Sequence, residues 1–161
     1  MRYRRSRRSN SLLFLAARLG WTLDSTGAGT SSYVRRAGLH AAFIWWDGDQ
    51  SKLSAEALAA CQSTENSLHL SLASVWELQI KMQLGKLALR LPLADVLRDQ
   101  QQQNGLVLEP VTLEDILALS ALPALHRDPF DRLIIAQANR GGFHLVTHDP
   151  ELARYPVAVL W

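Results

Sequence analysis

The pattern that most constrains this chain is the alternation of short apolar segments with longer amphipathic ones, which begins at Ala42 and continues to Trp161. The short segments have the length and composition of buried β-strands, and the longer ones repeat their apolar residues at helical spacing. Strands that alternate with helices form a parallel sheet with crossover helices. The sequence therefore predicts a single mixed α/β domain. The predicted strands are 68–72, 106–111, 143–147 and 157–160, and the predicted helices are 54–62, 74–84, 92–103, 112–122, 129–140 and 150–155.

The N-terminal part of the chain differs in composition from the rest. Residues 1–38 hold eight arginines and one acidic residue, a charge of +7, whereas the remaining residues carry a charge of −5. A basic segment of this kind can bind nucleic acid by neutralising phosphates, without sequence preference. A disordered or mistranslated leader is the simpler interpretation, and residues 22–32 have the composition of a flexible linker. We therefore expect an atypical, Arg-rich leader over residues 1–41 and a folded domain over residues 42–161.

Cysteine content and apolar run lengths bear on the compartment. The single cysteine, Cys61, excludes an intramolecular disulfide and fits a reducing compartment. The longest apolar runs fall far short of the ~20 residues that span a bilayer. Arginines ahead of residues 12–15 imitate a secretory signal, but Arg18 interrupts the apolar run and no cleavage site follows. We expect a soluble, cytoplasmic protein that does not associate with membranes.

Several carboxylates occupy positions where predicted strands end or where the following helices begin. Glu77 lies one turn into the helix after strand 68–72, and Asp149 directly follows strand 143–147. Asp128 and Asp131 bracket the start of the helix over residues 129–140. Because strand ends and helix starts share one edge of a parallel sheet, these acids meet if the strands are neighbours. Clustered carboxylate oxygens are the ligands of a hard divalent cation.

Helix capping is an alternative explanation for most of these acids. Ser74 and Glu77 have the spacing of a capping box, in which Glu77 would only satisfy a backbone donor. Asp128 and Asp149 each precede a proline, which is the pattern of a helix N-cap. Asp131 has no such explanation, because Asp128 already fills the cap and a second carboxylate three residues later repels the first.

Three segments of the chain resemble PIN-domain ribonucleases, in particular the toxin subunits of VapBC-type toxin–antitoxin pairs. The resemblance extends from about Ala42 to Trp161, and the residues AFIWWDGDQSKLS resemble the first helix of that branch. The three segments are SLASVWELQIKMQLGKL, LHRDPFDRLIIAQA and LVTHDPELARYPVAVLW.

This resemblance implies a three-layer α/β/α fold with a short parallel sheet, and an endoribonuclease that depends on Mg²⁺ or Mn²⁺. It assigns metal binding to Glu77, Asp131 and Asp149, and it makes Asp128 an additional catalytic acid. RNA is the implied substrate, and the implied partners are a second copy of the chain and a small antitoxin that covers the acidic groove. A divalent ion in such a site polarises the phosphoryl oxygen and lowers the pKa of bound water.

One acid of the family pattern is missing. Family members begin with a strand that ends in an aspartate, but alignment on residues 42–46 places Leu39 or Gly38 there, and neither binds a metal. Asp24 could fill the place only if a long loop followed it. We therefore expect the domain to lack its normal first strand, as a shifted reading frame or a wrong start would cause. We also expect marginal stability unless the leader supplies a replacement strand.

Loss of that aspartate leaves the activity open. The alternative to an impaired nuclease is a degenerate PIN-like subunit that binds an antitoxin without cleaving RNA. A third hypothesis is an Arg-rich arm that binds nucleic acid and is joined to an inert α/β scaffold.

Basic and aromatic residues near the acids each have two interpretations. Lys81, Lys86 and Arg132 could contact RNA phosphates, but solvation at the surface explains them equally well. Lys81 follows Glu77 by four residues, so an exposed ion pair between the two would also suffice. Three tryptophans fit core or subunit-interface positions better than base stacking, namely Trp45, Trp46 and Trp76.

Overall fold

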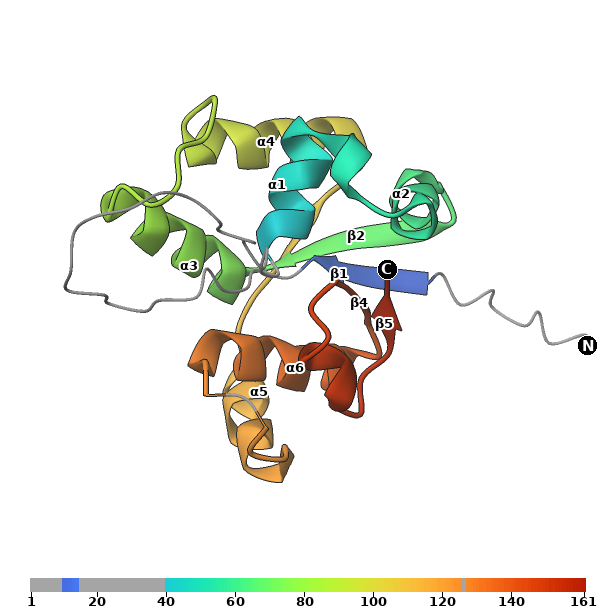
Figure 1. Ribbon diagram of the computed structural model, residues 1–161, viewed down its shortest axis with the longest axis vertical. Coiled ribbons are helices and arrows are strands. Elements are labelled where there is room, and N and C mark those ends of the chain that lie inside the picture. Colours follow the sequence, from blue (N-terminus) through green and yellow to red (C-terminus); the bar gives the residue numbers. More distant parts are fainter. Residues whose placement is uncertain (1–9, 15–39, 126) are drawn as a thin grey trace, which may run out of the picture.

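In the computed structural model, residues 10–14, 40–125 and 127–161 are described (Figure 1). Their strands form one five-stranded sheet in the order β3-β2-β1-β4-β5, and every neighbouring pair is parallel. The parallel sheet with its helical connections confirms the predicted mixed α/β class. The strands are β1 (Asn10–Phe14), β2 (Asn66–Ser71), β3 (Val107–Glu109), β4 (His144–Val146) and β5 (Val159–Leu160).

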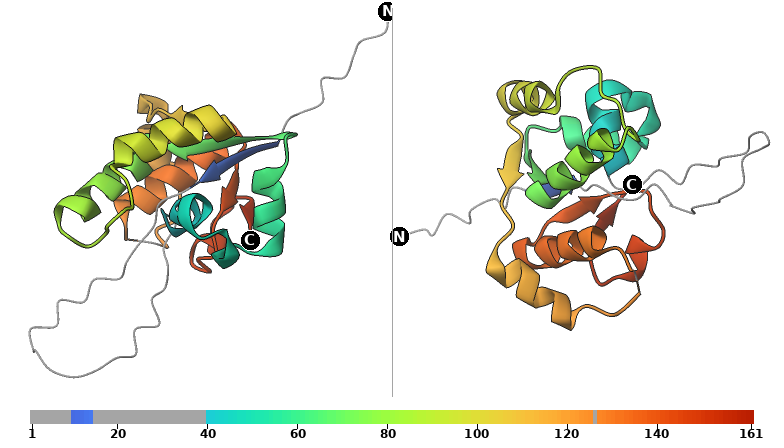
Figure 2. Two further views of the ribbon diagram at one scale, coloured as in Figure 1. Left: turned by 90° about the horizontal axis from the view of Figure 1, so that it is seen from above. Right: turned by 90° about the vertical axis from the view of Figure 1, so that its left-hand side faces the viewer.

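Helices cover both faces of the sheet and give three layers (Figures 1 and 2). One face carries α1 (His40–Gly48), α2 (Ala55–Gln62), α3 (Leu72–Gln83) and α4 (Leu93–Asn104), and the other carries α5 (Leu113–Ala118) and α6 (Pro129–Gly141). Short 3-10 turns, η1 (Gln50–Lys52), η2 (Leu119–Ala121) and η3 (Leu152–Arg154), complete the connections. Within the described ranges, no helix has the length and apolar character needed to cross a bilayer.

The central strand comes from the segment that we expected to be a leader. Strand β1 pairs with β2 from Asn10↔Asn66 to Phe14↔Leu70, and with β4 from Leu12↔His144 to Phe14↔Val146. The apolar sequence Leu12 to Phe14 suits a strand that has neighbours on both sides. The strand that precedes α1 among the described residues therefore comes from residues 10–14 of the assumed leader. Asp24 and the other leader residues, apart from His40 and Ala41 at the start of α1, lie outside the described residues.

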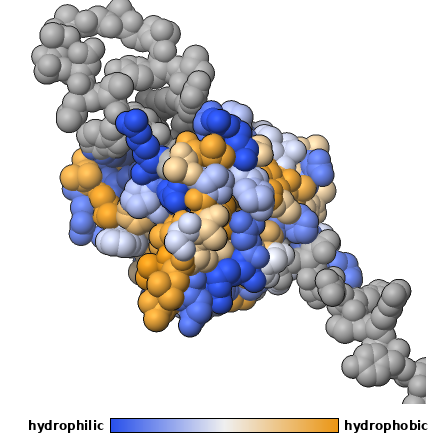
Figure 3. Space-filling view, turned by 90° about the horizontal axis from the view of Figure 1, so that it is seen from below, coloured by the Kyte–Doolittle hydropathy of each residue, from blue (hydrophilic) through white to orange (hydrophobic). Residues whose placement is uncertain are grey.

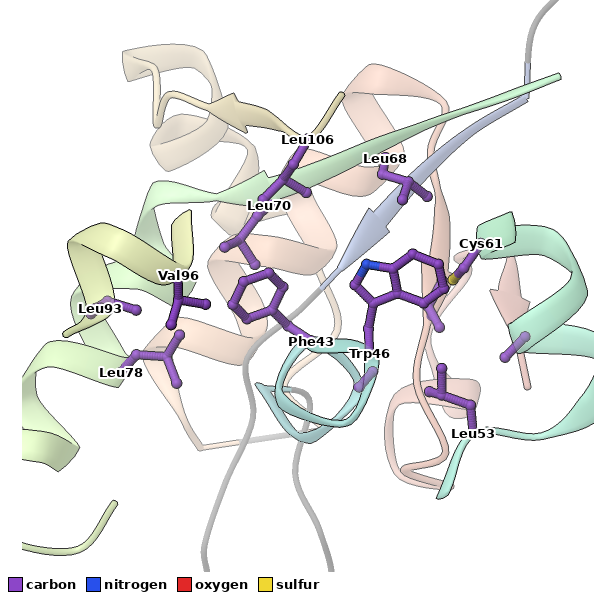
Figure 4. Close-up of a cluster of buried hydrophobic side chains, with 13 residues drawn as sticks. Phe43, Trp46, Leu53, Cys61, Leu68, Leu70, Leu78, Leu93, Val96 and Leu106 are labelled. Carbon is purple, nitrogen blue, oxygen red and sulfur yellow. The ribbon is translucent and has the colours of Figure 1, made fainter. Parts of the chain in front are cut away.

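Two apolar clusters hold the helices to the sheet. Between the sheet and helices α1 to α4, Phe43 and Trp46 of α1 pack with Leu70 of β2 and Leu78 of α3 (Figure 4). On the other face, Ile134 and Ile135 of α6 lie in a second cluster. Its other buried members are Ala73, Ala138, Leu145, Leu152 and Tyr155. Burial of one such large aliphatic side chain stabilises the fold by about 1.5–3 kcal/mol. These clusters fix the positions from which the acidic side chains extend.

Some elements differ from the prediction at their ends. Helix α3 begins at Leu72, two residues early, because the Ser71 hydroxyl accepts a hydrogen bond from the Ala73 N–H and caps the helix. The predicted helix 150–155 is only the 3-10 turn η3, and the predicted helix 112–122 is α5 followed by η2. Helix α6 ends at Gly141, one residue later than predicted. Gly142 follows as its C-cap with φ +66°, the left-handed conformation that glycine adopts readily at the end of a helix.

Candidate active site

The carboxyl ends of β2 and β4 and the start of α6 meet at one edge of the sheet. Helix α3 leaves this edge directly after β2 and carries Glu77, while the loop after β4 carries Asp149. Helix α6 begins here with Asp128 as its N-cap and Asp131 in its first turn. Open α/β folds place their sites at this edge.

Asp131 lies at the centre of the acidic group. Its side chain is fully buried, and burial is the largest effect that raises the pKa of its carboxyl, to about 9. The negative charges of nearby carboxylates raise this pKa further, whereas the positive charge of Lys81 lowers it. Those nearby carboxylates belong to Asp128, Glu77 and Asp149. The structure therefore places all four acids, from three separate segments, within one electrostatic environment.

Glu77 and Lys81 form an ion pair at the edge of this group. Lys81 Nζ donates to Glu77 Oε1 at 2.5 Å, and the two residues are only 7% and 5% exposed. Burial raises the pKa of Glu77 most; Asp128 adds to the rise and Lys81 opposes it. Glu77 Oε2 is buried and has no hydrogen-bond partner among the described residues. The pair has the predicted spacing but is buried rather than exposed, because this face of α3 packs against α6.

The capping explanation of Glu77 is wrong. Ser71 caps α3, and Ser74 lies within the helix with its side chain fully buried. Glu77 therefore sits in the second turn, beyond the reach of the N-terminal backbone donors. Since Glu77 does not stabilise the helix start, its buried carboxylate calls for another explanation.

Asp128 and Asp149 do have capping roles. Asp128 Oδ1 accepts a hydrogen bond from the Phe130 N–H at 2.9 Å and starts α6, with Pro129 as the first helical residue, as predicted. Asp149 Oδ1 accepts from the Glu151 N–H at 2.9 Å, so it closes a turn before η3 rather than starting a helix at Pro150. Each capping bond occupies one of the roughly four acceptor positions of a carboxylate, so capping by itself does not exclude cation binding.

The donor set fits a hard divalent cation in its chemistry. Carboxylate oxygens, completed by water, are what Mg²⁺ and Mn²⁺ bind, and a cation would relieve the repulsion that raises the Asp131 pKa. Among the described residues, however, no three acidic, histidine or cysteine side chains lie close enough together to hold a metal ion. Strand β1, with the sequence NSLLF, contributes no carboxylate.

Comparison with known protein families decides the fold family. The model of the PIN domain matches residues 41–158, which is most of the chain. The chain belongs to the PIN-domain family. This membership indicates a nuclease that acts on nucleic acid, and PIN nucleases generally depend on divalent metals. No curated protein shows significant similarity to the chain.

The three basic residues predicted to contact RNA lie in different settings within this PIN domain. Lys81 is held in the buried pair with Glu77. The Arg132 guanidinium donates to the carbonyl oxygens of Pro123 at 2.9 Å and Leu119 at 3.1 Å, so it braces the loop between η2 and α6. Lys86 is half-buried just beyond the end of α3. Their role in RNA binding stays a prediction.

Two hydroxyl side chains at the same edge were not predicted from the sequence to belong to the site. Thr147 Oγ1 accepts a hydrogen bond from the Asp149 N–H at 3.1 Å, and the Thr147 side chain is 2% exposed. Ser71, fully buried, sets the start of α3 and thereby the position of Glu77. Serine or threonine directly after an apolar strand is the signal that could have identified both, since these hydroxyls bond to backbone N–H groups nearby. Both residues position acids of the PIN domain rather than contribute carboxylates.

Proposed function

We propose that this PIN domain is a metal-dependent endoribonuclease and the toxin subunit of a type II, VapBC-type toxin–antitoxin pair. The observation that carries the proposal is that Glu77, Asp128 and Asp149 all lie near enough to the buried carboxyl of Asp131 for their charges to raise its pKa. Four acids in one partly desolvated site cost stability unless a cation balances them. The RNA substrate and the antitoxin come from the sequence resemblance, and the cytoplasmic location is the expectation drawn from the single cysteine and the short apolar runs.

Each acid has a distinct role in this proposal. Glu77, Asp131 and Asp149 hold Mg²⁺ or Mn²⁺, and Asp128 is an additional catalytic acid next to them. When bound, the ion supplies Lewis acidity at the scissile phosphate and lowers the pKa of a water molecule. Lys81 keeps the Glu77 carboxylate oriented through its hydrogen bond to Oε1. Lys86 and Arg132 are the further contacts that we assign to RNA phosphates.

A degenerate subunit that binds an antitoxin without cleaving RNA is the second candidate. One observation favours it, because β1 carries no acid and the described residues hold no finished metal site. Loss of one carboxylate weakens the charge balance that retains the ion. An intact fold with an incomplete site would still present its surface to a partner.

Cleavage of a fluorescently labelled RNA with Mg²⁺ or Mn²⁺ tests the enzyme directly. We expect fragments that disappear with EDTA and with Asp131→Ala. The control is Asp95→Ala, which removes an exposed acid on α4 that pairs only with Arg98 among the described residues. Metal-dependent cleavage that survives Asp131→Ala would overturn the assignment of that residue.

A second variant separates an impaired enzyme from a degenerate one. Leu15 directly follows β1 in the sequence, and the resembled family ends this strand in an aspartate. For an impaired nuclease, Leu15→Asp should raise the cleavage rate at least about tenfold, since each ligand contributes strongly to metal affinity. If neither the wild-type protein nor Leu15→Asp cleaves RNA while both bind an antitoxin, the degenerate subunit is the correct interpretation.

A further inference from the structure

A cavity of about 510 Å³ lies at the edge of the sheet opposite the acids. Its floor is apolar and consists of Trp46, Cys61 and Leu68, which are buried and lie close together (Figure 4). Polar residues from the ends of η1, α2, β2 and α4 surround this floor. They include Gln50, Gln62, Ser63, Thr64, Asn66, Gln103 and Asn104. A concave apolar floor with a few polar groups is the usual form of a small-molecule site.

The rim of the cavity consists of neutral amides and hydroxyls. Among the described residues that line it, none is charged. Three of the amides are fixed by their nitrogen ends: Asn66 Nδ2 donates to the Ala60 carbonyl at 2.7 Å, Gln50 Nε2 donates to the Trp46 carbonyl at 3.1 Å, and Asn104 Nδ2 donates to Gln100 Oε1 at 2.7 Å. No described residue donates to the oxygen ends of these three amides, so the rim holds oriented acceptors.

This cavity is separate from the acidic site. Strand β2 begins at Asn66 in the cavity and ends at Ser71 on the acidic edge, a span of roughly 15–20 Å at about 3.3 Å per residue. The cavity also lies on the face of the sheet covered by α1 and α4, whereas Asp131 belongs to α6 on the other face. A ligand in the cavity therefore does not touch the carboxylates.

We infer that the cavity binds an uncharged nucleobase, presented by a nucleoside. A neutral rim offers no opposite charge to a phosphate or a carboxylate. A charged ligand would therefore lose hydration without compensation, so an uncharged ligand fits the cavity better. The oriented oxygens of Gln50, Asn66 and Asn104 offer acceptors, and the amides of Gln62 and Gln103 carry both donors and acceptors, which match the groups on a base edge. The apolar floor, where Trp46, Cys61 and Leu68 line the cavity, offers a nonpolar contact to the base. The proposal does not depend on the nuclease activity.

Isothermal titration of the full-length protein with adenosine, guanosine, cytidine and uridine tests this inference. We expect at least one nucleoside to bind saturably and more tightly than its own 5′-monophosphate. Gln103→Ala and Gln62→Ala, at exposed positions on the rim, should each weaken that binding about tenfold, the effect of losing one good base contact. Gln102→Ala, an exposed neighbour on α4 outside the cavity, should leave it unchanged.

Three results would overturn the inference. They are saturable binding by none of the four nucleosides, equal binding of nucleoside and monophosphate, and nucleoside binding that both rim variants leave intact. Asp131→Asn provides the separation from the nuclease proposal, because it should abolish RNA cleavage and leave nucleoside affinity as it is in the wild-type protein.

Discussion

At the scale of single residues, Asp131 is the position where stability and proposed function conflict. A carboxyl that is fully buried beside three other acids is expensive to ionise, and its pKa of about 9 expresses that cost. Because the folded-state pKa exceeds the unfolded-state value, the folded protein binds more protons than the unfolded chain between about pH 4 and pH 9. Stability without metal therefore falls as the pH rises through this range.

Replacement of Asp131 by Asn removes that titration. Asp131→Asn should raise the free energy of unfolding at neutral pH by about 1–4 kcal/mol in the absence of metal, and it should flatten the decline of stability between about pH 5 and pH 9. Urea unfolding followed by circular dichroism, in buffers with EDTA, measures both effects. Asp95→Asn is the matched control on an exposed acid. An unchanged pH profile in Asp131→Asn would show that Asp131 is not the buried titrating group.

Among the elements, α5 and α6 depend on one buried carboxylate. Asp115 closes a capping box with Thr112 and accepts a hydrogen bond from Arg140 Nη1 at 2.5 Å. Burial favours the neutral form of Asp115, but the hydrogen bonds from Thr112 and Arg140 outweigh burial and lower its pKa. Its stabilising contribution is therefore present at neutral pH and is lost as the pH falls below the ordinary range of a carboxyl group.

Removal of this side chain should destabilise the pair of helices. Asp115→Ala should lower the free energy of unfolding by about 1–3 kcal/mol at pH 7, because it removes a helix cap and the partner of Arg140. The difference from the wild-type protein should shrink in acid, where the wild-type carboxylate is protonated. Chemical denaturation at neutral and acidic pH measures this difference in the free energy of unfolding. Glu114→Ala, which removes an exposed acid in the same turn, is the control. A difference that stays constant down to about pH 2 would contradict this explanation.

The sequence predicts the elements where each carries its own pattern. Helix α6 was predicted almost to the residue, because its Asp-Pro start and its apolar repeat are local signals. Strand β1 was not predicted, because Leu12 to Phe14 lie among arginines and resemble a signal segment; only β2 and β4 on either side make it a strand. The burial of the Lys81–Glu77 pair likewise depends on α6, which no local pattern reveals.

Removal of the central strand tests the role of residues 10–14. Deletion of residues 1–14 exposes the unpaired edges of β2 and β4 and should give a protein that aggregates or unfolds. Deletion of residues 2–8, which leaves β1 whole, is the control and should leave the midpoint of thermal unfolding unchanged. Size-exclusion chromatography and circular dichroism distinguish the two. A monodisperse, cooperatively folded product of the longer deletion would contradict the strand order.

At the scale of the whole molecule, exposed apolar residues lie on helices α3 and α5, in addition to the acidic edge of the sheet. Figure 3 views the α5–α6 side, and apolar residues are visible on this side of the molecule. Leu113, Ile116 and Leu117 of α5 are exposed, and Trp76 of α3 is 62% exposed with its ring against Phe130. Apolar patches on soluble proteins usually mark interfaces. We propose that these exposed apolar residues belong to the contact surface of the homodimer that the sequence resemblance implies.

A charged residue within this surface should disrupt such a dimer. Leu117→Lys should shift the protein from dimer to monomer in sedimentation velocity experiments, with no loss of helical content, because Leu117 is 62% exposed and outside the core. Gln102→Lys, which places a positive charge at an exposed position on α4 on the other face of the sheet, is the control for added charge. A wild-type protein that is monomeric throughout the micromolar range would contradict the dimer.

The four candidate acids could be proposed from sequence because each stands near a predicted strand end or helix start, but their arrangement in space could not be predicted. That arrangement depends on the side-chain geometry of α3, α6 and the loop after β4, which the periodicity of the sequence does not encode.

We propose that these acids together bind a divalent cation. Titration of Mn²⁺ into the full-length protein, followed by calorimetry, tests it most directly. We predict saturable binding that Asp131→Asn weakens at least about tenfold. Equal Mn²⁺ binding by both proteins, or no binding by the wild-type protein, would contradict it.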